Sequence, residues 1–244
     1  MGGSVKGRRV ACATRGLENM MTSECTKPAV TNADVTSASE LDREVGQLAW
    51  SIYRRSDIDT VVMGSGVANL LGTAIVRYMR ADASMVRVED PGAALPSTLT
   101  KADIDAACAG LDEVFVVEVT PDELHDALER RSALLELDES SCPRLVDTSN
   151  SDGVRTIRYA HFSGISCEVD LHKPAGERVT KLTMSNGDKL PGVLRLAVAD
   201  SGDACGSYRV IERCDRPLAS VVEAYVAKHS PVAVRAYGST RYCW

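Results

Sequence analysis

Apolar residues recur at regular spacings over residues 39–90 and predict a run of consecutive helices and strands. Ser39 is a good N-cap, and the apolar stripe that follows it indicates a helix ending at Arg54 and Arg55. The β-branched run over residues 58–63 predicts a short strand that is buried in a sheet. A first edge strand is expected within residues 30–36, ahead of this helix and strand.

A glycine turn follows the predicted strand, and a second helix is expected to start after Ser65. Residues 85–88 alternate as a third strand does. The segment 92–112 reads as an insertion that contains a short helix capped by Thr100 and ended by a glycine. Residues 114–119 are all apolar except one and predict a fully buried strand.

The second half of the chain is expected to contain mostly short strands, with a helix at each end of the series. Thr120 opens a predicted helix that runs to about Leu135. Asn186-Gly187 is a hairpin signal, Asp215 is expected to cap a last helix, and residues 231–236 are expected to form a strand. Further short strands are predicted over 154–161, 165–171, 179–184, 193–199 and 208–212.

The pattern predicts an α+β protein with two units. There is also a faint internal repeat, because residues 44–65 and 220–239 each read as a helix followed by a strand that ends in Gly-Ser. The predicted organisation is an extended or flexible arm (1–29), an α+β domain (30–120), a linking helix with an acidic linker (121–142) and a β-rich α+β domain that ends in the partial repeat (143–244).

The amino-acid composition and the net charge limit the classes of function that the chain can have. The 244 residues are 44% hydrophobic and 25% charged, which is typical of a globular protein. The net charge of −6 argues against unaided, tight binding of naked nucleic acid, so any anion binding must be local. Acidic residues concentrate in residues 101–142, and the residues after them are mildly basic.

The eight cysteines include no Cys-x-x-Cys pair, and the four histidines lie far apart, so no metal site and no cofactor are expected. Free thiols are the default for such a chain and indicate a reducing intracellular compartment. The first seventeen residues carry four basic and no acidic side chains, which leaves the cytoplasm and the mitochondrial matrix both open. No apolar run is long enough for a membrane span, and we expect no membrane insertion.

The turn over residues 64–69 is the strongest candidate site. Gly64, Ser65, Gly66 and Asn69 place backbone N–H groups at a helix N-terminus, which is anion-binding geometry. The segment looks like the start of a dinucleotide-binding (Rossmann) fingerprint, with an acidic residue about where a ribose-binding carboxylate would stand. Asn69 occupies the place of the third glycine. A nucleotide-binding enzyme or regulator is therefore one alternative.

A second interpretation rests on the expected βαβαββ order. The matching segments are Thr36-Ser-Ala-Ser39, Val45-Gly-Gln-Leu-Ala49, Asp57-Ile-Asp-Thr-Val-Val-Met-Gly-Ser-Gly66 and Ala74-Ile75. In these segments residues 35–120 resemble the Alba superfamily, which includes the sporulation stage V protein S family. The resemblance implies an Alba-like domain with residues 92–112 inserted, and contact with an RNA or DNA backbone, usually by a dimer.

Backbone contact requires arginine or lysine clusters. Residues 36–39 contain neither, and the remaining candidates are Arg54, Arg55, Arg77, Arg80 and Arg87. On this basis the sequence favours a non-catalytic RNA-associated binding or assembly subunit of a ribonucleoprotein-type complex, with protein partners and a possible homodimer. The alternatives are the nucleotide-binding protein and a purely structural interaction subunit. We expect no catalytic residue.

Overall fold

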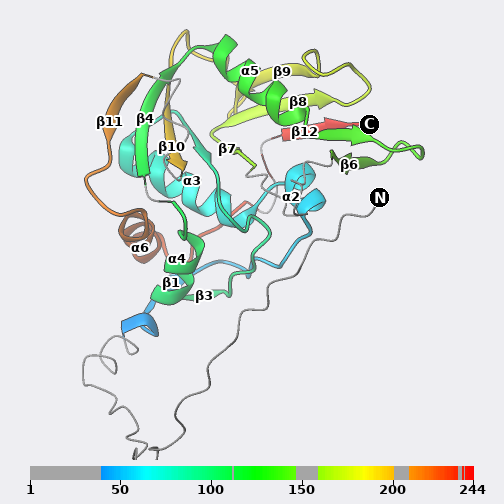
Figure 1. The fold of residues 1–244 in the computed structure, drawn as a ribbon. Coiled ribbons are helices and arrows are strands. Elements are labelled where there is room, and N and C mark those ends of the chain that lie inside the picture. Colours follow the sequence, from blue (N-terminus) through cyan, green and yellow to red (C-terminus); the bar gives the residue numbers. More distant parts are fainter. Residues whose placement is uncertain (1–39, 112, 147–158, 201–208, 236–237, 239) are drawn as a thin grey trace, which may run out of the picture.

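The computed structural model describes residues 40–111, 113–146, 159–200, 209–235, 238 and 240–244 (Figure 1). The helices are α2 (Asp57–Met63), α3 (Gly66–Met79), α4 (Lys101–Ala107), α5 (Pro121–Ser132) and α6 (Leu218–His229). The strands are β1 (Glu44–Gln47), β2 (Ala83–Val86), β3 (Thr98–Thr100), β4 (Glu113–Val119), β5 (Leu135–Leu137), β6 (Pro143–Leu145), β7 (His161–Ser163), β8 (Ile165–Asp170), β9 (Val179–Met184), β10 (Leu194–Asp200), β11 (Val210–Arg213) and β12 (Thr240–Cys243).

A five-stranded sheet with the order β11-β4-β10-β2-β7 forms the centre of the protein. Strand β10 pairs in parallel with β2 and antiparallel with β4, so that Leu196 lies opposite both Ala83 and Val117. A three-stranded sheet (β12-β8-β9) and two pairs (β1-β3 and β5-β6) complete the strand pairing.

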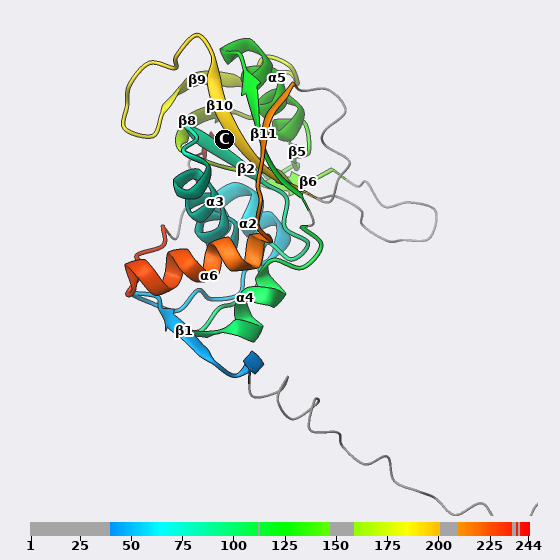
Figure 2. The same cartoon turned by 90° about the vertical axis from the view of Figure 1, so that its left-hand side faces the viewer.

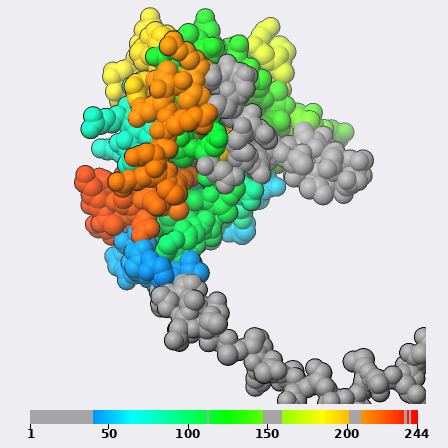
Figure 3. Space-filling view, turned by 60° about the vertical axis from the view of Figure 1, so that its left-hand side comes forward, coloured from blue at the N-terminus to red at the C-terminus, as the bar shows by residue number. Residues whose placement is uncertain are grey.

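Each face of the central sheet is covered by a separate hydrophobic cluster. Helices α3, α4 and α6 pack with β1 on one face, and α5 packs with β8, β9 and β12 on the other. Figures 1 and 2 show these two layers, with α6 beside α3 and with α5 beside β8 and β9. Figure 3 shows β11 and α6 running in orange down one side of the molecule to the blue segment that contains β1.

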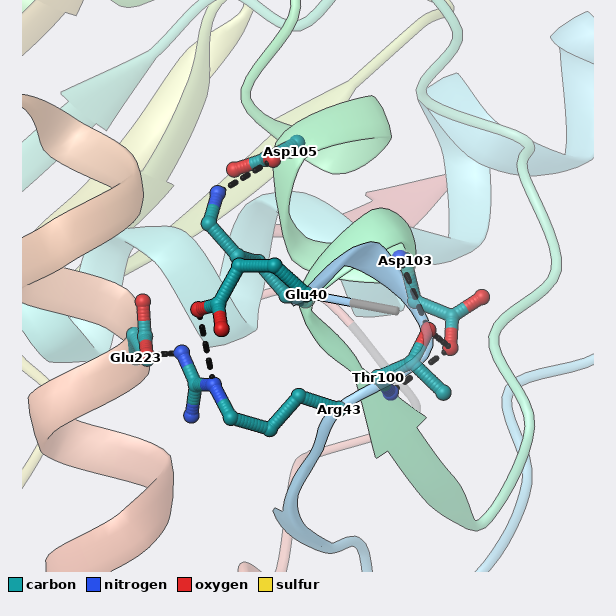
Figure 4. A network of polar contacts seen from close by, with 7 residues as sticks. Glu40, Arg43, Thr100, Asp103, Asp105 and Glu223 are labelled. Atoms are coloured by element: carbon teal, nitrogen blue, oxygen red, sulfur yellow. Dashed lines mark hydrogen bonds and ion pairs between the residues drawn. The ribbon is translucent and has the colours of Figure 1, made fainter. Parts of the chain in front are cut away.

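Ion pairs tie β1 to the helices around it (Figure 4). Arg43 lies just before β1, and its guanidinium pairs with Glu40 at 2.9 Å and with Glu223 of α6. Thr100 and Asp103 form a reciprocal capping box at the start of α4, which satisfies two backbone donors there. The ion pair with Glu223 thus ties the start of β1 to α6, and the capping box stabilises the start of α4.

Two predictions for residues 39–63 are wrong. The predicted helix over 39–55 contains the strand β1, because its apolar side chains reach the core in an extended chain: Val45 and Leu48 are both buried. The predicted strand over 58–63 is the helix α2, capped at Ser56 and ended by Gly64 with a φ of 95°. Capping and burial thus outweigh β-propensity, and the described residues up to Val119 do not follow the βαβαββ order.

Other corrections concern the second half. The helix after Asp215 begins at Leu218 with Pro217 as its N-cap. Residues 231–236 contribute a single β-bridge, at Val232. Asn186-Gly187 forms a turn after β9, but β9 and β10 are not paired, so it makes no hairpin. The first copy of the proposed repeat is a strand followed by a helix, so the repeat is also wrong.

Several predictions are confirmed. They include α3, the strands near 85–88 and 114–119, the Thr100 and Thr120 caps, and the strands at 165–171, 179–184, 193–199 and 208–212. The α+β class is confirmed. β10 lies between β2 and β4, so the segments 30–120 and 143–244 share one sheet, and segment 92–112 supplies β3 and α4. Residues 1–29, the expected edge strand within 30–36 and most of the predicted strand 154–161 lie outside the described residues.

Among the described residues no single helix is long and apolar enough to cross a membrane. Helices α2 and α3 meet that test of length and composition only when taken together, and they bend by 45° at the break between them. The absence of membrane insertion remains a prediction.

The close approach of α3 to the sheet depends on Gly72. A Cβ atom at this position would lie 2.6 Å from Ser84 Oγ and 2.9 Å from Ser163 Oγ, in β2 and β7. We expect Gly72→Val to destabilise the protein by about 2 kcal/mol, as overpacking of a core does, measured by urea unfolding. Gly192→Val is the matched control, since its Cβ would meet nothing within 4 Å. Equal stability of the two variants would contradict this account of the packing.

His161 makes the fold sensitive to acid. Burial, and to a smaller extent the nearby charge of Arg131, lowers the pKa of His161 from 6.5 to about 3. The unfolded chain therefore binds a proton below pH 6.5 that the folded protein does not accept until about pH 3. Stability from this group is complete above pH 6.5 and falls as the pH drops through that window.

The acid sensitivity can be measured by urea unfolding between pH 7 and pH 4. We expect His161→Phe to reduce the loss of stability by up to about 1.4 kcal/mol per pH unit. The exposed His172→Phe variant is the control and should behave as the wild type does. An unchanged pH dependence in His161→Phe would show that other groups cause the acid sensitivity.

Candidate functional site

An aromatic and arginine-lined cavity of about 290 Å³ opens where four chain segments meet. The segments are the stretch after β1, the start of α3, the turn before β3 and the stretch after α6. We call it the aromatic cavity. Its lining residues are 50–53, Arg55, Gly66, 91–93, Val234 and Arg235.

Backbone hydrogen bonds fix two walls of the aromatic cavity. Ile52 and Leu95 exchange two N–H···O bonds of 2.8 and 2.9 Å, which hold the stretch after β1 beside the turn before β3. Arg55 N–H donates to the Gly92 carbonyl at 3.0 Å. Gly92 has no room for a side chain, because a Cβ there would lie 2.4 Å from the Arg55 carbonyl oxygen.

The side chains of the aromatic cavity combine apolar surface with positive charge. Trp50 is 48% exposed and Tyr53 is 81% exposed, so both rings are available to a ligand. Arg55 Nη1 donates to the Gly64 carbonyl at 2.8 Å, which orients its guanidinium. Arg235 is exposed, and its carbonyl accepts from Asn69 Nδ2 at 3.0 Å. Flat rings beside guanidinium groups suit a ligand that has both an aromatic part and an anionic part.

The predicted anion turn is built into the wall of the aromatic cavity. Ser65 caps α3, since its Oγ accepts from Ala68 N–H at 3.0 Å and donates to the Pro91 carbonyl at 2.7 Å. Gly66 lines the aromatic cavity, and a Cβ there would lie 2.8 Å from an Ile52 methyl group. Gly64, Ser65, Gly66 and Asn69 are all buried. Anion binding by this turn remains a prediction.

The other predicted arginines do not meet in one patch. Arg54 forms an exposed ion pair of 2.7 Å with Asp90. Arg77 lines a second cavity, of about 400 Å³, which Asn69 also lines. Arg80 lines a third cavity at the C-terminal end of α3, and Arg87 lines a fourth, beside α5. Of the five candidates, only Arg55 lines the aromatic cavity, so the structure gives no continuous basic surface from this set.

Sequence reasoning missed four residues of the aromatic cavity: Trp50, Tyr53, Gly92 and Arg235. The chain has only two tryptophans, and Trp50 lies in the segment 39–55 that was wrongly predicted as a helix. The available signal was the spacing of Trp50, Tyr53 and Arg55 within six residues. Arg235 could not be linked to them, because it joins the aromatic cavity only through tertiary structure.

Two buried cysteines supply no reactive thiol to a site. Burial raises the pKa of the Cys108 thiol to about 12 and that of the Cys167 thiol to about 11, so both remain protonated and unreactive near neutral pH. In the part of the chain that the structure describes, no group of three or more His, Cys, Asp or Glu residues is arranged to hold a metal ion.

Comparison with known protein families gives one match. The family model of the 5'-nucleotidase C-terminal domain matches residues 44–198, which is more than half of the chain. No curated protein matches the chain.

Solved structures share this fold at low sequence identity. A putative 5'-nucleotidase from Staphylococcus aureus in complex with alpha-ketoglutarate is 14% identical, with a TM-score of 0.71 over 88% of this chain and 44% of that chain. The Haemophilus influenzae NAD nucleotidase is 12% identical, with a TM-score of 0.62 over 85% and 39%. The Thermus thermophilus sulfate thiohydrolase SoxB in complex with glycerol is 15% identical, with a TM-score of 0.60 over 86% and 37%. The chain thus spans less than half the length of these relatives.

These findings correct the sequence-based interpretation. The resemblance to the Alba superfamily is wrong, because the family match and the structural neighbours are of the 5'-nucleotidase type. The RNA-associated, ribonucleoprotein-type function is wrong for the same reason. The dinucleotide-binding fingerprint also lacks its structural context, since the glycine turn follows the helix α2 and not a strand. Protein partners, a homodimer and the intracellular compartment remain predictions.

The close contact at Gly92 generates a prediction for the aromatic cavity. We expect Gly92→Ala to push the turn before β3 away from Arg55 and to lower the free energy of unfolding by about 2 kcal/mol, as overpacking does. The measurement is thermal unfolding, and Ala93→Ser on the same turn is the control. A Gly92→Ala variant as stable as the control would show that the two walls can separate at no cost.

Proposed function

The chain belongs to the family of 5'-nucleotidase C-terminal domains, and from this premise we propose that its aromatic cavity binds a nucleotide. One observation carries the proposal: two exposed aromatic residues and two arginines line the same space of about 290 Å³. The chemical requirements of a nucleotide, a flat apolar base and an anionic phosphate, match these two kinds of side chain.

The rings supply the contact for the base. Stacking of a nucleobase on an aromatic side chain contributes about 1–3 kcal/mol per base and tolerates any base, since each has a π-face. Trp50 and Tyr53 are held on one short segment whose backbone is bonded to the turn before β3. A segment fixed in this way loses little freedom when a ligand binds, which favours affinity.

The guanidinium groups supply the contact for the phosphate. Arg55 and Arg235 both line the aromatic cavity, and arginine binds phosphate through paired N–H donors. Arg55 is already oriented by the Gly64 carbonyl. The chain carries a net charge of −6, so these two cations provide the local attraction that the protein as a whole lacks.

The relatives support a nucleotide as the ligand, since two of the structural neighbours are described as nucleotidases. We propose that this domain positions a nucleotide within a nucleotide-hydrolysing enzyme. The role assigned to the described residues is binding and orientation. This proposal agrees with the nucleotide-binding alternative from the sequence. It assigns the binding to Trp50, Tyr53, Arg55 and Arg235 instead of the glycine turn.

Nucleotide binding can be followed by the fluorescence of Trp50. Trp50 and Trp244 are the two tryptophans of the chain, so Trp244→Phe leaves Trp50 as the sole tryptophan. We expect adenosine monophosphate to quench this signal by stacking, and Tyr53→Ala or Arg235→Ala to raise the dissociation constant about tenfold. Adenosine should bind more weakly than the monophosphate, because it lacks the group that the arginines contact.

Arg209→Ala is the matched control, because it removes one exposed arginine that does not line the aromatic cavity. It should bind adenosine monophosphate as the wild type does. Absence of quenching at millimolar nucleotide would contradict the proposal. It would also be contradicted if Arg209→Ala raised the dissociation constant as much as Arg235→Ala does.

A further inference from the structure

A separate cavity of about 230 Å³ lies between the C-terminal half of α5 and the β2–β7 edge of the central sheet. It belongs to the face of the sheet opposite α3, because Met85 and Phe162 cluster there with the apolar side of α5. None of its described lining residues also lines the aromatic cavity. We call it the arginine cavity. Its lining residues are Met85, Arg87, Ala127, Arg130, Arg131, Leu134, Ala160 and Phe162.

Arg131 is a buried cation held by neutral groups. It is 7% exposed, and its Nη atoms donate to Thr240 Oγ1 and to the Val61 carbonyl, each at 3.1 Å. The guanidinium carbon lies 5.8 Å from the centre of the Tyr242 ring. Its Nε atom is buried and has no acceptor, and no carboxylate among the described residues forms an ion pair with it. Burying a charge without an opposite charge is costly.

Arg87 and Arg130 add two more cations to the same space. Arg87 forms an ion pair of 3.0 Å with the buried carboxylate of Asp200, and its Nε atom is buried without an acceptor. Arg130 is exposed, and no hydrogen bond or ion pair holds it among the described residues. Three arginines therefore line this space, and Asp200 is the only carboxylate that forms a described ion pair with any of them.

We propose that the arginine cavity binds a small organic oxyanion, a phosphate or carboxylate group carried on an apolar body. The oxyanion would accept from the guanidinium groups and compensate their excess charge, because arginine N–H groups match the paired oxygens of such anions. Met85, Leu134 and Phe162 would contact the apolar body. The volume is below the range of about 300–1,000 Å³ that is usual for drug-sized ligands, which limits the ligand to a small molecule.

Arg130 allows a test that spares the fold, since it is exposed and takes part in no described interaction. The probe is phenylphosphonate, a benzene ring that carries a phosphonate and cannot be hydrolysed as an ester can. Titration calorimetry on the full chain should show saturable binding. We expect Arg130→Ala to weaken it about tenfold, because a charge-assisted hydrogen bond is lost, and Arg130→Lys to weaken it less.

Arg209→Ala is again the matched control. Arg209 precedes β11, which lies at the edge of the sheet opposite β7, and the variant should bind phenylphosphonate as the wild type does. Inorganic phosphate should bind more weakly than phenylphosphonate, because it has no apolar body. In NMR spectra, the backbone amides of Ala127, Leu134 and Ala160 should shift on titration.

The outcome is separable from that of nucleotide binding. Arg235→Ala should leave phenylphosphonate binding unchanged, and Arg130→Ala should leave the quenching of Trp50 by adenosine monophosphate unchanged. Absence of phenylphosphonate binding at millimolar concentration would overturn the assignment. An equal affinity of wild type and Arg130→Ala, or of phenylphosphonate and inorganic phosphate, would also overturn it.

Discussion

Strand β10 is the constraint on which the rest of the structure depends. It is hydrogen-bonded on both edges, to β2 in parallel and to β4 antiparallel, and it is buried on both faces. Ala197 and Ala199 contact the α3 side, while Leu194, Leu196 and Val198 contact the α5 side. The backbone N–H and C=O groups of a buried strand must be hydrogen-bonded to its neighbours. The positions of β2 and β4 are therefore fixed by their pairing with β10.

The aromatic cavity follows from this arrangement. Because β2 is fixed beside β10, the turn after β2 lies over the start of α3, where Ser65 donates to the Pro91 carbonyl. The stretch after β1 is then bonded to that turn at Ile52 and Leu95. Trp50, Tyr53 and Arg55 are in this way brought to Arg235, which lies about 180 residues further along the chain. The proposed ligand site is thus formed mainly by segments that connect helices and strands.

The charge at the two cavities differs in sign from the net charge of the chain. The chain is acidic overall, and several exposed arginines are paired with a carboxylate, as Arg54 is with Asp90. Both cavities are lined by arginines. The aromatic cavity has Arg55 and Arg235, and the arginine cavity has Arg131 buried against neutral partners. Arginines gathered at a cavity of an acidic protein are a local signal for anionic ligands.

The sequence by itself determined those elements whose signals are local. The Thr100 and Thr120 caps, α3 and the apolar strand β4 were predicted correctly, because a capping side chain or a long apolar run acts within a few residues. In other segments the apolar residues fit both a helical and a strand period, and only the tertiary structure determined which of the two forms. Val45 and Leu48 reach the core from an extended chain that pairs with β3, and Val61 reaches it from a helix. In both, long-range pairing and burial outweighed propensity, and for the same reason the sequence alone could not bring Trp50 and Arg235 to one cavity.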